Sequence, residues 1–401
     1  MAHIHEPKLR TPYNVVKKIL DSTELRPIVA VVVGTRPGIV MFAPIIHALR
    51  REHVPHFVIH TGQHYAPNMD AQFFQDLELP ESEYKISGVS ERKTHGAQTA
   101  AMLEGVESIL LKEQPCLVLV GGDANTNLAG ALAARKLRIA VGHVEAGERS
   151  YDWRMPEEHN RRMIDHISDY LFTTGEKGKK QLEKESVQGE IIVTGNPIVD
   201  ASLQHLSLAL QKSDALRRFS LVPKGYALLT THRGENVDFP ELLRRSLEGV
   251  SRASQVLNLP VIFLAHPRTQ KRLREFGLWE WAHDLPGVSV RDAVGYLDFL
   301  NLIAHARLVF TDSGGVQQEA CIHQVAAVTL RENTEWVETL EHGANRLAGT
   351  DPERIVAAAR KARETIMAFC QPSVARCQRK FSPSARTTPG ALILASLATG
   401  T

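Results

Sequence analysis

The segment from His143 to Arg161 concentrates side chains that can move protons. It reads HVEAGERS over residues 143–150 and MPEEHNR over residues 155–161. Carboxylates that cluster at the end of a strand can raise each other's pKa and act as general acid and base. We therefore expect Glu145 to be functional. Glu157 has two interpretations, because Pro156 and the two following glutamates are also typical of the first turn of a helix.

A second motif, Thr311-Asp312-Ser313-Gly314-Gly315, precedes a predicted helix. A serine and two glycines at a helix start present free backbone N–H groups at the positive end of the helix dipole. This arrangement predicts a diphosphate site. Glu319, about one helical turn further on, can accept hydrogen bonds from ribose hydroxyls. The alternative is a plain helix cap, since aspartate and serine favour that position.

The loop Gly34-Thr35-Arg36-Pro37-Gly38 follows the first predicted strand. Its glycines allow a ligand to approach the backbone closely, and Arg36 can neutralise a phosphate. The pattern is neither GxGxxG nor a Walker loop, so the common nicotinamide and ATP motifs are absent from it. A strand–helix turn with an arginine paired to an acid is the other interpretation.

A fourth motif, Thr231-His232-Arg233-Gly234-Glu235-Asn236, also follows a predicted strand. A single histidine is more often structural. With arginine, glutamate and asparagine beside it, His232 is a candidate acid, base or phosphate contact.

Composition excludes several classes of protein. The 401 residues carry 47 Lys and Arg against 45 Asp and Glu, a balance unlike that of a nucleic-acid-binding or polybasic membrane-binding protein. The four cysteines form no CxxC pair, the histidines form no HExxH, and there is no GxSxG, so we expect neither a metal site nor a serine hydrolase. We also see no secretory signal and no apolar run near the length of a membrane helix, and we expect a cytoplasmic protein.

Short β-branched runs alternate with helical patterns, which predicts parallel sheets covered on both faces. The predicted strands are at residues 28–33, 54–59, 116–120, 139–144, 191–193, 226–229, 261–264, 308–311 and 327–330. The pattern restarts after about residue 205. We therefore predict an α/β protein of two doubly wound, Rossmann-like domains over residues 28–205 and 206–380. An extension over 1–27 and a segment over 381–401, which we expect to pack back on the first domain, complete the chain. The motifs follow strands, and ligands bind at the carboxyl ends of strands in such sheets, so domains that face each other would line one cleft.

Taken together, the motifs resemble the non-hydrolysing UDP-N-acetylglucosamine 2-epimerase family. The matching stretches occur in family order over most of residues 28–350: GTRPG, TGQHY, GGDANT, HVEAGERS, MPEEHNRRMIDHISDYLF, TGNPIVDA, THRGENVD, HPRT, DSGGVQQEA and LRENTEWVET. The long MPEE and TEWVE stretches are most similar to the branch that contains epimerases of UDP-2,3-diacetamido-uronic acids.

The resemblance implies a GT-B fold, a homodimer, a UDP-sugar substrate, and no redox cofactor or metal. The implied reaction removes the C2 proton, expels UDP and re-adds it to the opposite C2 stereoisomer of the enzyme-bound glycal. The implied acid/base set is Asp123, Glu145 and Glu157, assisted by His232. The implied substrate and UDP contacts are Arg36, Gln63, Arg149, Arg233, His266, Ser313, Gly314, Gly315 and Glu319.

The chain departs from the family at its first loop. The family usually reads GTRPE there, with a lysine or arginine three residues later, whereas this chain has Gly38 and Met41. Arg149 or Arg154 is a candidate to replace the missing cation. Two other hypotheses stay open: a related enzyme that hydrolyses or transfers the sugar, and a non-catalytic nucleotide-sugar binding protein.

Overall fold

The computed structural model describes residues 26–63, 73–341 and 343–369. Internal contacts divide the chain into two compact units, an N-terminal unit that extends to Ala201 and a C-terminal unit that begins at Ser202. This division falls inside helix α8 (Pro197–Lys212), which also contains the predicted boundary at residue 205. The predicted extension before residue 26 and the predicted segment from residue 381 lie outside the described residues.

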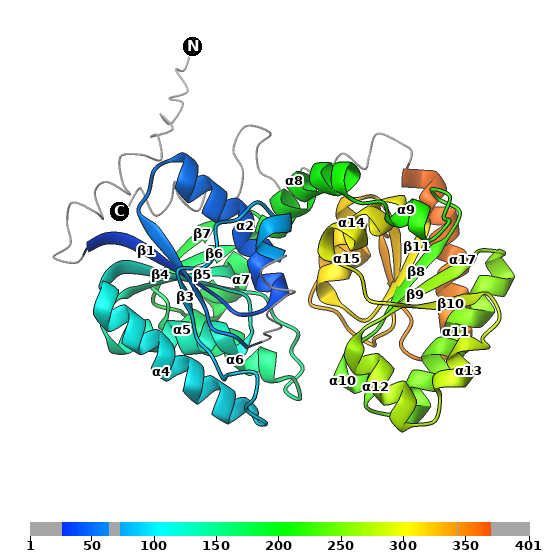
Figure 1. Ribbon diagram of the computed structural model, residues 1–401, viewed down its shortest axis with the longest axis horizontal. Helices are drawn as coiled ribbons and strands as arrows, with labels where there is room; N and C mark the ends of the chain where they lie inside the picture. The colour runs from blue at the N-terminus through cyan, green and yellow to red at the C-terminus, as the bar shows by residue number, and fades with distance from the viewer. Residues whose placement is uncertain (1–25, 64–72, 342, 370–401) are drawn as a thin grey trace, which may run out of the picture. The chain divides into compact units, whose positions relative to one another are not determined.

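Seven parallel strands form the sheet of the N-terminal unit (Figure 1). Their order is β3-β2-β1-β4-β5-β6-β7, which contains the strand order of doubly wound nucleotide-binding folds. The strands are β1 (Arg26–Val33), β2 (His56–His60), β3 (Tyr84–Lys85), β4 (Pro115–Gly121), β5 (Ala140–Ala146), β6 (Tyr170–Thr173) and β7 (Glu190–Val193).

Helices cover both faces of this sheet. Ala30, Val32, Val118 and Val120 pack with apolar residues of the helices that include α4 and α5, and Figure 1 shows α2 on the opposite face. Besides α8, the helices of this unit are α2 (Arg36–Arg51), α4 (His95–Glu113), α5 (Asn125–Lys136), α6 (Pro156–Ile167) and α7 (Glu176–Glu185).

Six parallel strands form the sheet of the C-terminal unit, in the order β10-β9-β8-β11-β12-β13. They are β8 (Ala227–Thr230), β9 (Val261–Ala265), β10 (Val288–Asp292), β11 (Leu308–Thr311), β12 (Ala326–Thr329) and β13 (Asn345–Leu347). The helices are α9 (Ala215–Arg218), α10 (Gly234–Val237), α11 (Pro240–Leu257), α12 (Pro267–Glu275), α13 (Trp279–His283), α14 (Tyr296–His305), α15 (Gly314–Ile322), α16 (Val337–Glu341) and α17 (Pro352–Phe369).

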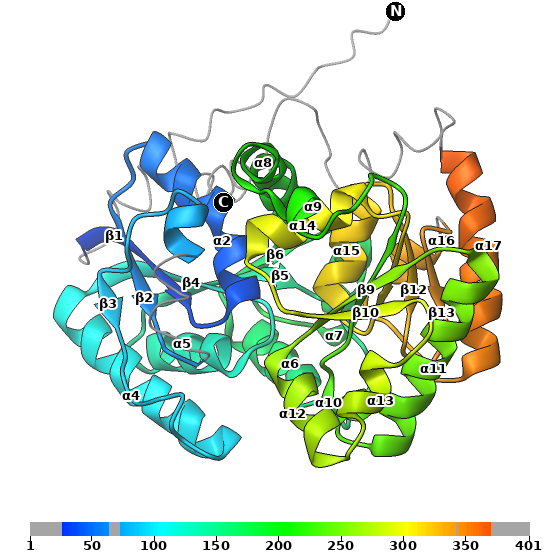
Figure 2. The same ribbon diagram turned by 45° about the vertical axis from the view of Figure 1, so that its right-hand side comes forward.

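The core of the C-terminal unit lies on both sides of its sheet. Leu229 and Phe310 point to one apolar cluster, and Leu228 and Val309 point to another, as strand alternation requires. Helices α11 and α17 pack together over the first cluster (Figure 2). In the described part of the chain, no helix is long and apolar enough to cross a membrane.

The strand order reverses at one point in each sheet, between β1 and β4 in the first and between β8 and β11 in the second. Such switch points are where doubly wound sheets bind ligands, outside the carboxyl ends of the strands. Four motifs from the sequence lie at or directly after the ends of these four strands, at residues 34–38, 121–123, 231–233 and 312–315. The predicted fold class of two doubly wound α/β domains is therefore confirmed, and the fold places the motifs at its ligand-binding edges.

Candidate active site

Two of the predicted acid/base residues lie at the ends of neighbouring strands in the N-terminal unit. Asp123 follows β4, and Glu145 lies near the end of β5, which pairs with β4. Gly122 precedes Asp123 and adopts a φ of +78°. A β-carbon placed on Gly122 would lie 3.9 Å from Oε1 of Glu145, so the glutamate extends along the glycine turn that carries Asp123.

The backbone at Glu145 is unusual for a strand. Its φ is +68°, and the register between β5 and β6 shifts between Val144 and Ala146. Such irregularities at a strand end redirect a side chain, and a non-glycine residue in the left-handed region is typical of functional sites. The bulge therefore supports the functional interpretation of Glu145.

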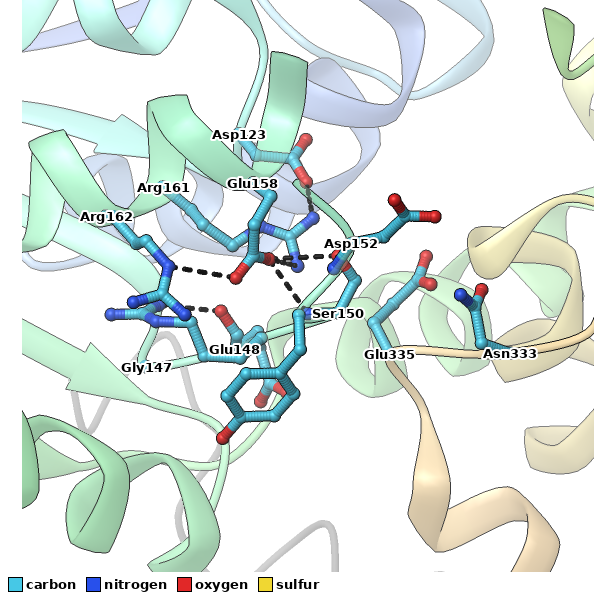
Figure 3. A network of polar contacts seen from close by, with 12 residues as sticks. Asp123, Gly147, Glu148, Ser150, Asp152, Glu158, Arg161, Arg162, Asn333 and Glu335 are labelled. Atoms are coloured by element: carbon cyan, nitrogen blue, oxygen red, sulfur yellow. Dashed lines mark hydrogen bonds and ion pairs between the residues drawn. The ribbon is translucent and has the colours of Figure 1, made fainter. Parts of the chain in front are cut away.

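Asp123 is held in place by the helix that follows β5. Its carboxylate forms an ion pair with Nη2 of Arg161, and its backbone carbonyl accepts a 2.9 Å hydrogen bond from Nδ2 of Asn160. Figure 3 shows Asp123 and Arg161 pointing toward each other. Sequence reasoning missed Arg161, although the spacing to Glu157 places both residues on one side of α6.

The adjacent glutamates of α6 have different surroundings. Glu158 is fully buried and accepts hydrogen bonds from the N–H of Ser150 at 2.9 Å and from Nε of Arg162 at 3.0 Å (Figure 3). Glu157 is half-buried, and its carboxylate has no hydrogen bond or ion pair with the described residues. Of the two interpretations of this pair, the structural one fits Glu158, while Glu157 keeps a carboxylate that a substrate can use.

Arg149 lies inside a buried ion-pair network. Its side chain is 1% exposed, and its Nη2 lies 2.6 Å from Glu185 and 2.7 Å from Asp165. Burial alone would raise the pKa of Glu185, but hydrogen bonds from Arg149 and Gln181 outweigh it and lower that pKa. This placement favours a structural role for Arg149 over the predicted contact with a UDP-sugar, which stays a prediction.

Neither proposed replacement for the family's loop cation is in contact with Asp123. Arg149 is occupied as described, and Arg154 is 87% exposed and paired with Asp152. Met41 is 5% exposed, and its Sδ would lie 2.8 Å from a β-carbon on Gly121. The thioether therefore packs against the turn that leads to Asp123.

Glycine is required at position 34, because a β-carbon there would collide with the hydroxyls of Thr61 and Thr126. Gln63 accepts two hydrogen bonds of 2.8 Å from Thr126, one from its N–H and one from its hydroxyl, and so caps the start of α5. Arg36 is half-buried and is the first residue of α2, two positions after Gly34. The predicted roles of Gln63 and Arg36 in substrate binding stay predictions.

In the C-terminal unit, a fully buried carboxylate organises the loop after β8. Asp312 accepts hydrogen bonds from the hydroxyl of Thr231 at 2.6 Å, from the N–H groups of His232 and Arg233 at 3.0 Å, and from Nδ2 of Asn236 at 3.2 Å. Sequence reasoning treated Asp312 as part of a glycine loop. Asp312 directly follows β11, which pairs with β8, and this position is the signal that Asp312 can hold the loop after β8.

His232 and His266 lie together at the ends of β8 and β9, with ring centroids 5.4 Å apart. Desolvation lowers the pKa of His232, although the Asp312 carboxylate, 3.6 Å from Nδ1, opposes this. Burial of the ring therefore favours its neutral form, which has a nitrogen lone pair that can accept a hydrogen bond. His266 caps α12, because its Nδ1 accepts a hydrogen bond of 3.2 Å from the N–H of Arg268.

The glycine pair at the start of α15 is shaped by another segment of the same unit. A β-carbon on Gly314 would collide with Oε1 of Glu335 and lie 3.0 Å from Nε1 of Trp336, whereas Gly315 is open. The side chain of Ser313 makes no capping hydrogen bond to the helix, so the alternative interpretation of this motif as a plain helix cap does not describe Ser313. Nη1 of the buried Arg331 donates to Glu335 at 3.0 Å and keeps the TEWVE segment against the glycines.

Glu319 is buried one helical turn into α15. Desolvation raises its pKa from 4.5 to about 7, and a hydrogen bond from Tyr296 opposes this only in part. Its carboxyl is therefore partly protonated near neutral pH. Among the described residues, no group of three or more His, Cys, Asp and Glu side chains is arranged to hold a metal ion.

Comparison with known proteins identifies relatives of this chain. Residues 47–382 match the family model described as UDP-N-acetylglucosamine 2-epimerase. The UDP-N-acetylglucosamine 2-epimerase of Methanocaldococcus jannaschii is 47% identical over 333 residues, 82% of this chain and 90% of that protein. The UDP-2,3-diacetamido-2,3-dideoxy-D-glucuronate 2-epimerase of Pseudomonas aeruginosa is 37% identical, with the same coverage.

A solved structure resembles the fold as well. The crystal structure of the M. jannaschii UDP-GlcNAc 2-epimerase in complex with UDP-GlcNAc and UDP superimposes with a TM-score of 0.77 at 44% identity, and covers 85% of this chain and 99% of that one. The expected GT-B type of fold, with its two doubly wound domains, agrees with this neighbour.

Proposed function

The chain belongs to the UDP-N-acetylglucosamine 2-epimerase family, and we propose that it inverts C2 of a UDP-N-acetylhexosamine. The observation that most supports this reaction is the placement of the acid/base residues. Asp123 follows β4 directly after Gly122, and the Glu145 side chain at the end of the paired strand β5 lies beside Gly122; the ends of the strands are where a doubly wound sheet presents groups to a ligand.

The reaction balances without an oxidant. A carboxylate takes the C2 proton, the C2–H electron pair forms the C1–C2 double bond, and the C1–O bond breaks with its electrons on UDP. UDP then returns to C1 while a proton is delivered to the opposite face of C2. Because the sugar is not oxidised overall, no redox cofactor is needed. Asp123, Glu145 and Glu157 are the proposed proton carriers.

The C-terminal unit is proposed to hold the nucleotide. The backbone N–H groups of Ser313, Gly314 and Gly315 suit the diphosphate, because they stand at the start of α15. Glu319 is proposed to accept from the ribose. The paired rings of His232 and His266 are proposed to contact the diphosphate as UDP departs, with Arg233 beside them.

Two substrates are favoured by the relatives. The M. jannaschii relative is named for UDP-N-acetylglucosamine, and the P. aeruginosa relative for a UDP-diacetamido-glucuronate. We propose UDP-N-acetylglucosamine as the first substrate to test, because the former relative is more similar to this chain. The family resemblance also supports a homodimer, testable by sedimentation, and a cytoplasmic location, testable by fractionation of the producing cell.

Proton NMR of the enzyme with UDP-N-acetylglucosamine in deuterated water tests the reaction. We expect deuterium at C2 and a product of manno configuration. Glu145→Gln should abolish the exchange, because an amide cannot take up the proton. Glu183→Gln, which alters an exposed glutamate of α7, is the matched control and should exchange as the wild type does.

The same experiment separates the other hypotheses, for which Gly38 and Met41 are the motivation. Free UDP that accumulates in proportion to the sugar consumed would indicate a hydrolysing enzyme. Turnover that requires a separate acceptor would indicate transfer. Binding of UDP-sugars without exchange on either class of substrate would contradict the epimerase proposal and favour a binding protein.

A further inference from the structure

Eight ionisable side chains of the N-terminal unit form a closed circuit that begins and ends at the turn carrying Asp123. Each member contacts the next, and carboxylates alternate with basic groups around the circuit. In order, the members of this charge ring are Asp123, Arg161, Glu158, Arg162, Glu185, Arg149, Asp165 and His143.

The contacts of the ring are close and mostly buried. Arg162 links Glu158, 3.0 Å from its Nε, to Glu185, 3.3 Å from its Nη1. Arg161 Nη1 lies 3.6 Å from Glu158, which is fully buried. The last step returns to the start, because Nε2 of His143 lies 3.0 Å from the carbonyl oxygen of Gly122, the residue before Asp123.

Charge balance in the ring depends on His143. The ring contains four carboxylates and three arginines, so one negative charge lacks a partner unless His143 is a cation. The half-exposed His166 approaches the ring at 3.8 Å from Glu185, at its solvent side. An unpaired charge costs most where burial is complete, and Asp165 is 0% exposed.

The hydrogen bonds of His143 point to the same state. Its Nδ1 lies 2.7 Å from Oδ1 of Asp165, and its Nε2 faces the carbonyl oxygen of Gly122. A carboxylate and a carbonyl oxygen both accept, so both ring nitrogens must donate. The ring of His143 then carries two protons and a positive charge. The other oxygen of Asp165 faces Arg149 Nη2 and the N–H of Gly147, which completes the support behind His143.

We propose that His143 is a positioning residue whose imidazolium fixes the Gly122 carbonyl and thereby the orientation of Asp123. Two residues of β5 hold the backbone of Gly122: His143 contacts its carbonyl oxygen, and its N–H donates to the carbonyl oxygen of Val144 at 3.0 Å. Arg161 and Asn160 hold Asp123 from α6. The ring thus sets the reacting carboxylate from two elements at once. This inference rests on the proposed function of Asp123 as an acid/base group.

The placement also bears on the methionine at position 41. Because Met41 brings no charge to the Gly121–Gly122 turn, the cations that the structure connects to this turn come from the ring. They are Arg161 on the carboxylate and His143 on the preceding carbonyl. The ring therefore supplies the turn with two cationic contacts that do not depend on the first loop.

The first test reads the two protons of His143 directly. The full-length enzyme labelled with ¹⁵N-histidine is examined by long-range ¹H–¹⁵N correlation spectroscopy, which distinguishes a doubly protonated ring from either neutral tautomer. We expect one histidine in the doubly protonated pattern, assigned by its loss in His143→Gln and its retention in His159→Gln, which changes an exposed histidine of α6. A neutral tautomer at His143 overturns the inference, whether or not the enzyme turns over UDP-sugars.

The second test uses two amides that imitate different ring nitrogens. His143→Gln places an N–H near Nε2 and can keep the bond to Gly122, whereas His143→Asn places one near Nδ1 and keeps the bond to Asp165. We expect the Asn variant to lose kcat by about tenfold or more with little change in KM, and the Gln variant to lose less, since a hydrogen bond to a charged group is worth roughly that factor.

Equal losses in the two variants, or losses in KM alone, would overturn the positioning role. Circular dichroism and thermal unfolding check that both variants fold. If the wild-type enzyme itself failed to exchange C2 hydrogen, the proposed function would fall while the NMR result on His143 would stand by itself.

Discussion

Replacing Glu319 by glutamine should remove a pH-dependent cost to stability in the C-terminal unit. The folded protein holds this carboxyl at a pKa of about 7, against 4.5 for a glutamate in the unfolded chain. Between these values the unfolded chain has released the proton and the folded protein keeps it. Stability therefore falls as pH rises from about 4.5 to about 7, and the loss is complete above pH 7.

The size of the effect follows from the two pKa values. At about 1.4 kcal/mol for each pH unit, the interval from 4.5 to about 7 corresponds to about 3.5 kcal/mol. Glu319 is 7% exposed, so solvent screening reduces this little. Glutamine has nearly the same shape and carries no charge at any pH. Part of this change falls below pH 5, so Glu319→Gln should gain about 2.5 kcal/mol of unfolding free energy relative to the wild type between pH 5 and pH 8.

Urea denaturation at pH 5 and pH 8, followed by tryptophan fluorescence, measures this difference. Three of the four tryptophans, Trp279, Trp281 and Trp336, lie in the C-terminal unit and report on its unfolding. Glu248→Gln changes an exposed glutamate of α11 and should follow the wild type at both pH values. Parallel pH dependence of the wild type and Glu319→Gln would refute the reasoning that burial holds the proton on Glu319.

Three further changes have definite expected outcomes. Gly147→Ala should cost about 3 kcal/mol of unfolding free energy in a thermal unfolding assay, because φ is +83° and the new β-carbon would lie 2.5 Å from the backbone oxygen of Gly178. The control Gly175→Ala has open space around its β-carbon and should cost less than about 1 kcal/mol in the same assay. Met41→Lys should move the acidic limb of the kcat/KM pH profile to lower pH, because a cation against the Gly121–Gly122 turn favours ionised carboxylates. An unchanged profile would show that this side chain does not act on Asp123 or Glu145. Asp312→Asn should lower stability to urea by about 2–4 kcal/mol, since one amide cannot accept from all four donors around the wild-type carboxylate, and a loss under about 1 kcal/mol would contradict its organising role.

The central strands could be predicted from the sequence because they are continuous apolar runs. Leu308–Thr311 was predicted at its observed bounds, and Cys116–Val120 within one residue of them. Four strands were not predicted individually: β3, β6, β10 and β13. Three of these lie near the sheet edges and are short or mix polar with apolar residues, so their strand state depends on pairing with a neighbour that local sequence does not reveal.

Residue type and strand position point to Glu145, and the family resemblance points to Asp123; the structure places both at the ends of neighbouring strands. The partners of these residues could not be predicted, because they depend on which helix face meets which loop. Arg161 was read as part of a motif and turned out to pair with Asp123, while Arg149 was predicted to contact the sugar and lies in a buried network. Distinguishing Glu157 from Glu158 also required the structure, since both occupy the first turn of the same helix.

The charge ring and the first sheet are encoded within a short stretch of chain, which matters while the protein is being made. All eight ring residues lie between positions 123 and 185, and the first sheet ends at Val193. At about 5–20 residues per second, the ribosome needs roughly 10–30 s more to add the described C-terminal unit. The carboxylates of the charge ring can thus pair with their cations before the C-terminal unit has been made. Substitutions in the ring should therefore act first on the yield of folded nascent chain, and only afterwards on the finished enzyme.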